Sequence, residues 1–180
     1  MTKNTYVQKI ARTAVLLAII LVIQCFKNFS VWISGPVVNA VLIIATLGVG
    51  LWSGILLAVI SPITSYLITG APIMALTKFS LFPVIMLGNA VLVIGVYVFM
   101  NRGKLGILWG MLTGSVVKWL VMWGCVSLLV APAFADVIAG KPALITALSW
   151  TFTHFQLIAA ILGCVIAYLV WLPLKKFLKR

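Results

Sequence analysis

Acidic side chains are almost absent from this sequence. Asp136 is the only one in 180 residues, against 13 lysines and arginines. This scarcity excludes catalysis by paired carboxylates and coupling of transport to protons or sodium through an intramembrane acid. The sequence also has no Ser/His/Asp set, no His-Glu-x-x-His and no Walker A lysine motif. We therefore expect a protein that is not an enzyme and does not hydrolyse ATP itself.

Cysteine is also scarce and is not arranged for metal binding. Cys25, Cys125 and Cys164 all lie in apolar segments, without a Cys-x-x-Cys or Cys/His cluster. The pattern predicts no metal site, no disulfide framework and no bound cofactor. The net charge of +12 does not indicate nucleic acid binding, because the basic residues flank apolar segments instead of covering a solvated face.

Apolar residues make up most of the chain. Hydrophobic residues account for 64% and charged residues for 8%, which is typical of a polytopic α-helical membrane protein. About 20 apolar residues cross the hydrocarbon core as a helix. We expect a single all-α membrane domain over residues 1–180, with the first segment retained as a helix and not cleaved as a signal peptide. The six predicted transmembrane helices cover about residues 10–26, 37–51, 54–69, 81–100, 105–130 and 147–172.

The distribution of basic residues predicts the orientation in the membrane. Cytoplasmic segments carry an excess of lysine and arginine. With both termini cytoplasmic, nine of the 13 basic residues fall on the cytoplasmic side. These nine are Lys3, Lys9, Arg12, Arg102, Lys104, Lys175, Lys176, Lys179 and Arg180, while Lys27, Lys78 and Lys141 fall outside.

The remaining basic residue, Lys118, lies inside the membrane. It is about 14 residues from Lys104, roughly 20 Å along a helix, which is too far for its side chain to reach the headgroups comfortably. An ammonium at this depth costs on the order of 3 kcal/mol and by default marks a functional site. The alternative is a lysine that only caps backbone carbonyls or a neighbouring polar group.

Helical spacing groups further candidates around this lysine. Lys118, Trp119 and Met122 share one face of their helix, and Trp150 and His154 share one face of the last helix. A donor beside an indole suits a partly aromatic ligand with an anionic or carbonyl group. The predicted substrate-binding residues are Asn39, Asn89, Lys118, Trp119, Met122, Trp150, His154 and Gln156, around a polar cavity that opens outward. A lone histidine can equally bridge two helices, and asparagines can link helices by hydrogen bonds.

The first span carries a stripe of small residues. Ala11, Ala14 and Ala18 lie along one side of the helix, and small residues at this spacing let another helix approach closely. The pattern predicts a docking face for a partner helix.

Several segments of the chain resemble one transporter family. They are Ala-Arg-Thr-Ala-Val-Leu-Leu-Ala from Ala11, Gly-Pro-Val-Val-Asn-Ala-Val-Leu from Gly35, Pro-Val-Ile-Met-Leu-Gly-Asn-Ala from Pro83 and Gln-Leu-Ile-Ala-Ala-Ile-Leu-Gly from Gln156. With six short spans and no energy-coupling group, the chain is similar over essentially its whole length to the substrate-binding S-components of energy-coupling factor transporters.

The resemblance implies a working scheme. An S-component of the bacterial cytoplasmic membrane captures a vitamin or related micronutrient at an outward-facing site formed by its fourth to sixth spans and outer loops. Its first helix, here at Ala14 and Ala18, docks on a membrane-embedded coupling subunit driven by two cytoplasmic ATPases. The S-component then topples in the membrane and releases the substrate inward.

The residues leave the substrate and the function class open. Lys118, His154 and the tryptophans favour a small amphipathic carboxylate of the lipoate, biotin or pantothenate kind. A queuosine-type base or a corrinoid fragment also suits aromatic surroundings. The alternative functions are an autonomous small permease or channel and a membrane enzyme that uses His154 and Lys118 on a lipid-linked substrate.

Overall fold

The computed structural model describes residues 3–26, 30–103 and 105–178, and within these ranges it contains helices and turns but no strand. In this described part of the chain, six helical segments are long and apolar enough to cross a membrane. The prediction of an all-α protein with six membrane-spanning helices is therefore confirmed. Of the basic residues that predict the orientation, Lys27, Lys104, Lys179, Arg180 and the side chain of Lys3 lie outside the described part of the chain.

The first four spans are single helices, and the last two are interrupted. The single helices are α1 (Lys3–Cys25), α2 (Val31–Gly48), α3 (Leu51–Thr69) and α5 (Leu81–Phe99), with the short α4 (Pro72–Leu76) before α5. The fifth span runs from α6 (Gly106–Cys125) through a π-helical turn, η1 (Val126–Val130), into α7 (Ala131–Ala133). After α8 (Ala135–Ile138), the sixth span joins α9 (Pro142–Thr146), the π-helical η2 (Ala147–His154) and α10 (Phe155–Leu178).

Two prolines lie shortly before the predicted starts of the second and sixth spans, and the helices begin before or at them. α2 begins at Val31 and includes Pro36, which lacks an N–H and so removes one backbone hydrogen bond near the start of the helix. The sixth span begins at Pro142, in the first turn of α9, where the missing N–H would have no intrahelical partner. Both spans are therefore longer at this end than the apolar pattern alone indicates.

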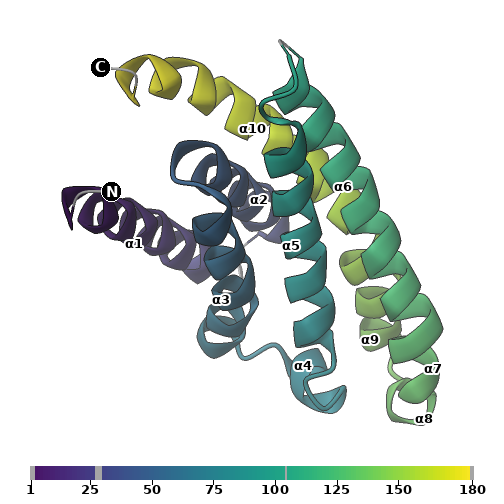
Figure 1. Cartoon of the computed structure of the whole chain (residues 1–180). Helices are drawn as coiled ribbons and strands as arrows, with labels where there is room; N and C mark the ends of the chain where they lie inside the picture. Colours follow the sequence, from purple (N-terminus) through teal and green to yellow (C-terminus); the bar gives the residue numbers. More distant parts are fainter. Residues whose placement is uncertain (1–2, 27–29, 104, 179–180) are drawn as a thin grey trace.

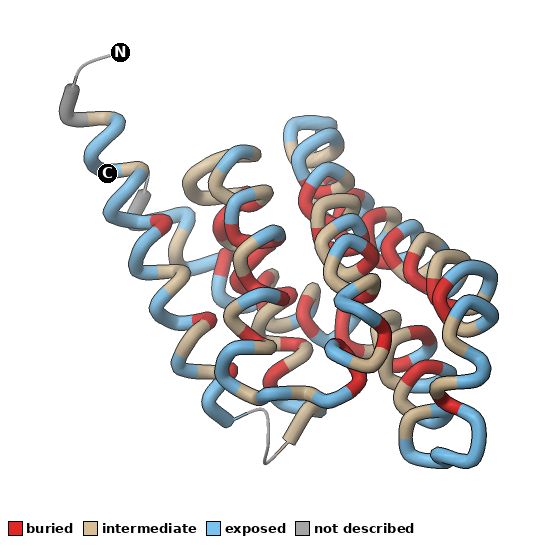
Figure 2. Tube along the Cα trace, turned by 90° about the horizontal axis from the view of Figure 1, so that it is seen from below, coloured by how far each residue is buried: buried red, intermediate tan, exposed pale blue. Residues whose placement is uncertain are grey.

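The two termini lie at one end of the helix bundle, and α4, α8 and α9 lie at the opposite end (Figure 1). α1 is at the edge of the bundle and is exposed along most of its length (Figure 2). Its buried side chains, Thr13, Ile20 and Gln24, form one stripe toward α2 and α3.

Glycine lets α5 and α6 pack backbone to backbone. A Cβ atom added to Gly95 would lie 2.7 Å from Gly114 Cα, and one added to Gly114 would lie 2.9 Å from the Leu92 carbonyl oxygen. Gly106, Gly110 and Gly114 recur every four residues, the spacing that permits close helix approach in membranes. This contact fixes α5 against the helix that carries Lys118.

A second close contact joins α10 to α2. A Cβ atom at Gly163 would lie 2.6 Å from Asn39 Cβ and 2.8 Å from the Pro36 carbonyl oxygen. The last helix is therefore packed directly on the turn of α2 that presents Asn39.

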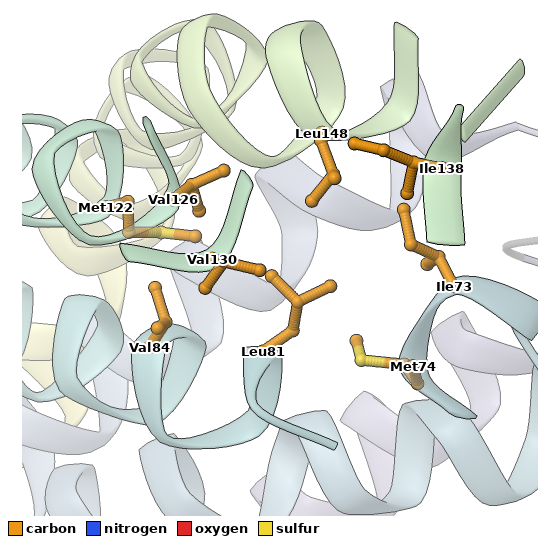
Figure 3. Packing of buried hydrophobic residues seen from close by; sticks show 9 residues of the cluster. All are labelled: Ile73, Met74, Leu81, Val84, Met122, Val126, Val130, Ile138 and Leu148. Carbon is orange, nitrogen blue, oxygen red and sulfur yellow. The ribbon is translucent and has the colours of Figure 1, made fainter. Parts of the chain in front are cut away.

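The end of the bundle away from the termini is filled by an apolar cluster (Figure 3). The residues come from α4, α5, α6, η1, α8 and η2: Ile73, Met74, Leu81, Val84, Met122, Val126, Val130, Ile138 and Leu148. The cluster holds the short segments α4 and η2 against the long helices, and these segments supply walls of the cavity described next.

Candidate functional site

Lys118 is buried in the centre of the bundle, with a side chain that is only 1% exposed. Its Nζ atom donates one hydrogen bond to Asn39 Oδ1 at 2.6 Å and another to Asn89 Oδ1 at 2.8 Å. The three residues belong to α6, α2 and α5, so the ammonium joins three helices. Gly88 makes room for this arrangement, because a Cβ atom there would lie 2.6 Å from Met122 Cγ and 3.5 Å from Lys118 Cγ.

Both amides are oriented by a second hydrogen bond. Asn39 Nδ2 donates to the Gly35 carbonyl oxygen at 3.1 Å, and Asn89 Nδ2 donates to Ser61 Oγ at 3.4 Å. Each amide thus turns its oxygen to the ammonium and its NH₂ group to another acceptor. The hydrogen-bond partners of the ammonium are thus oriented side-chain amides of two other helices.

Within the part of the chain that the structure describes, the side chains that bond to the Lys118 ammonium do not neutralise its positive charge. Asn39 and Asn89 are uncharged, and an ammonium has three N–H donors, of which these two bonds use two. Amide dipoles lower the cost of burying the charge, but a buried charge is normally paired. An anion beside Lys118 would supply both the missing charge and the third hydrogen-bond partner.

A cavity of about 270 Å³ lies next to this cluster. Its polar walls come from Gln24, Ser34, Asn39, Ser61, Ser65, Asn89, Lys118, Thr151 and Gln156. Its apolar walls include Val31, Val38, Ile73, Met74, Ile85, Phe152 and Phe155. α4, which contributes Ile73 and Met74 to the cavity walls, lies at the end of the bundle opposite the termini (Figure 1).

Trp32 and Phe155 form an edge-to-face pair beside this cavity. The centroids of the two rings are 4.8 Å apart and their planes are at 78°. The pair holds the start of α2 against the start of α10, and Gly35 accommodates it, since a Cβ atom at Gly35 would lie 3.2 Å from the Phe155 ring. One wall of the cavity is therefore aromatic and firmly packed.

The structure places the eight predicted substrate-binding residues in three different surroundings. Lys118, Asn39, Asn89 and Gln156 line the cavity. Met122 is buried in the apolar cluster and is not among the cavity walls. The remaining three, His154, Trp119 and Trp150, lie near one another and are not among the cavity walls.

This second group, which we call the exterior aromatic group, does not line the cavity. The His154 ring lies 5.9 Å from the Trp150 ring and 6.5 Å from the Trp119 ring, measured between centroids. His154 is exposed and Trp150 is 46% exposed. In η2, π-helical hydrogen bonding alters the helical register, and Thr151 and not His154 lines the cavity.

Sequence reasoning missed several cavity residues, chiefly Gln24, Ser61 and Ser65. Gln24 is a polar residue inside an otherwise apolar span, which is the signal that identified Lys118. Ser61 and Ser65 are four residues apart and so share one face of α3. Serine is common in membrane helices, however, because its hydroxyl can bond to the carbonyl one turn earlier, so this pattern alone is weak.

The donor set of the site does not suit a metal ion. Among the residues that the structure describes, there is no group of three or more His, Cys, Asp or Glu side chains that could hold one. The cavity offers amides, hydroxyls and one ammonium, which are groups that recognise an organic molecule through hydrogen bonds and charge.

Comparison with known families gives one match that covers most of the chain. The model of the family described as ECF transporter, substrate-specific component, matches residues 8–171. Comparison with curated proteins and with solved structures gives no match. The family match covers all the cavity residues described above.

Proposed function

The chain belongs to the family of ECF transporter substrate-specific components, and from this premise we propose that it captures a vitamin or related micronutrient in the cavity beside Lys118. The family is a transporter component and not an enzyme. Its cavity has the features of a small-molecule site, since it is mostly apolar and has a few convergent polar groups.

The observation that carries the proposal is the ammonium of Lys118, buried between two neutral amides. In our proposal the anionic group of the substrate binds Lys118 at the base of the cavity. The apolar part of the substrate then packs against Phe155, Ile73 and Met74. A small amphipathic carboxylate of the lipoate, biotin or pantothenate kind has both parts.

The proposed orientation places both termini in the cytoplasm of a bacterium, and the cavity toward the outside. An even number of spans keeps the two termini on one side, and the cavity wall in α4 lies at the other end of the bundle (Figure 1). The excess of basic residues near the termini supports this choice. In that orientation the substrate enters from the side on which nutrients are scarce.

The partner in the proposed complex is a membrane-embedded coupling subunit, which two cytoplasmic ATPases drive. Ala11, Ala14 and Ala18 are exposed on α1, the helix at the edge of the bundle. Small exposed side chains allow close approach of another helix. This face is therefore the proposed docking surface.

Native mass spectrometry of the purified protein in mild detergent tests the capture role. We expect the wild-type protein to retain one stoichiometric organic anion and the Lys118→Met variant to lose it. Lys141→Met is the matched control and should retain the molecule. Lys141 is exposed and immediately precedes α9. Retention of the same mass by Lys118→Met, or a retained cation, would contradict the proposed anion site.

Co-purification with the coupling subunit and the ATPases tests the docking surface. Ala14→Trp and Ala18→Trp should abolish the complex because a bulky ring prevents close approach. Ile19→Trp adds the same ring on a different side of α1, at a position that is 42% exposed, and should preserve the complex. Uptake into vesicles that contain this chain alone would instead support an autonomous permease.

A further inference from the structure

Gln24 brings a second polar recognition group into the cavity. It belongs to α1, it is only 3% exposed, and it lines the cavity. Its Nε2 atom donates to the Ser61 carbonyl oxygen at 2.8 Å, and its Oε1 atom accepts from the Thr64 hydroxyl at 2.8 Å. Since one end of the amide faces an acceptor and the other a donor, its orientation is fixed.

The fixed amide keeps unused hydrogen-bonding capacity. A glutamine side chain has two N–H donors and an oxygen that accepts two hydrogen bonds. Ser61 and Thr64 use one donor and one acceptor position, which leaves one of each within the described part of the chain. Buried polar groups are nearly always paired, so a molecule in the cavity is the natural partner for both.

Gln24 and Lys118 belong to one continuous polar wall. Ser61 accepts from Gln24 through its carbonyl oxygen and from Asn89 through its hydroxyl, and Asn89 in turn accepts from Lys118. Ser61 and Asn89 thus connect Gln24 to Lys118 through hydrogen bonds. In a cavity of about 270 Å³, one small molecule can meet both of them.

We propose that Gln24 determines the substrate class: a monoanion that also carries an amide, ureide or hydroxyl that donates and accepts hydrogen bonds. This inference rests on the proposed capture function. Of the carboxylates considered above, the biotin and pantothenate kinds have such a group and the lipoate kind lacks it. A site built to bond N–H or O–H groups rejects an analogue without them, because its own donor and acceptor are left buried and unpaired.

Equilibrium dialysis of the purified protein with lipoate, biotin and pantothenate tests this inference. We expect biotin or pantothenate to bind at least about tenfold more tightly than lipoate, the factor that one unmade buried hydrogen bond represents. Gln24→Leu should reduce this preference to less than about threefold, since leucine fills similar space without polar atoms.

Two further variants separate recognition from the support that Gln24 gives to α1. Thr13→Val removes a side-chain bond between α1 and α3 that does not involve Gln24, from Thr13 to Ser53, and should leave the preference unchanged. Thr64→Val leaves Gln24 in place but removes the hydrogen bond that orients its oxygen. The preference for biotin or pantothenate over lipoate should therefore fall partly. This variant serves as the test if Gln24→Leu does not fold.

Lys118→Met distinguishes failure of this inference from failure of the proposed function. If it leaves the binding of all three acids unchanged, the anion site itself is wrong. If it weakens all three while Gln24→Leu leaves their order unchanged, only the role of Gln24 is wrong. Binding of lipoate as tight as that of the other two, or no binding of biotin or pantothenate at millimolar concentration, also overturns the inference.

Discussion

Lys118 and His154 are both polar side chains beside tryptophans on apolar helices, yet the fold gives them opposite surroundings. Lys118 is 1% exposed and bonds to amides from two other helices. His154 is exposed, and its ring neighbours are Trp150, which is 46% exposed, and the half-buried Trp119. The first group offers charge and directed hydrogen bonds around a cavity, and the second offers an aromatic surface.

The difference shows what spacing along a helix can and cannot establish. Spacing identifies which residues share a face, but the neighbouring helices determine where that face points. An ammonium in hydrocarbon is costly, so Lys118 must find polar partners inside the bundle. Histidine and tryptophan tolerate the surface better, because their rings are partly apolar and can pack on one another. The following predictions test this contrast, from the largest expected effect to the smallest.

Replacing the charge at the cavity should have the largest effect. Lys118→Met removes the ammonium while keeping most of the apolar stem. We expect affinity for the retained molecule to fall by at least about 30-fold, because truncating one partner of a buried charged contact costs about 2–5 kcal/mol. Isothermal titration in detergent measures the change, with Lys141→Met as the control. A loss below threefold would show that Lys118 serves the fold and not the ligand.

Removing one amide partner should mainly reduce stability. Asn89→Leu leaves the ammonium with a single side-chain acceptor, Asn39, and should lower the free energy of unfolding by about 2 kcal/mol. Denaturant unfolding in detergent micelles gives this value. In the Lys118→Met background the same substitution should cost much less, because the charge is gone. If Asn89→Leu costs the same stability in both backgrounds, the hydrogen bond between Lys118 and Asn89 contributes nothing to stability.

A methyl group between α10 and α2 should disturb the cavity side of the molecule. Gly163→Ala places a Cβ atom against Asn39 and the Pro36 carbonyl, and we expect a loss of about 1 kcal/mol or more in unfolding free energy. Gly124→Ala is the matched control, since nothing lies within 4 Å of its added Cβ atom. Its stability should be unchanged or higher, because alanine favours helix more than glycine does. Equal effects at both positions would contradict the packing argument.

Truncation in the exterior aromatic group should have the smallest effect. His154→Ala should change affinity for the retained molecule by less than about threefold and stability by no more than about 0.5 kcal/mol, as expected for an exposed position. The same titration and unfolding measurements apply. A loss of affinity close to that of Lys118→Met would mean that the exterior group belongs to the binding site after all.

Much of the architecture could be predicted from local properties of the sequence. The number of spans and their helical structure follow from the length of the apolar segments. In hydrocarbon, a backbone without internal hydrogen bonds is too costly, and a helix forms all of these bonds within one segment. The choice of Lys118, Asn39 and Asn89 as candidate residues also rests on one property, polarity at membrane depth. The family resemblance from the helix 1 alanines and the other quoted segments is confirmed by the match over residues 8–171.

The contacts between helices decided the rest. Sequence alone determined that a buried lysine, a few amides and many tryptophans lie within six membrane helices. Only the tertiary structure decided that Gln24 faces the cavity and His154 does not, because Gln24 is placed by its contacts with α3 and His154 lies in the π-helical η2. Hydrophobic periodicity is too uniform in such helices to mark one inner face, so glycine contacts and hydrogen bonds between distant residues select it.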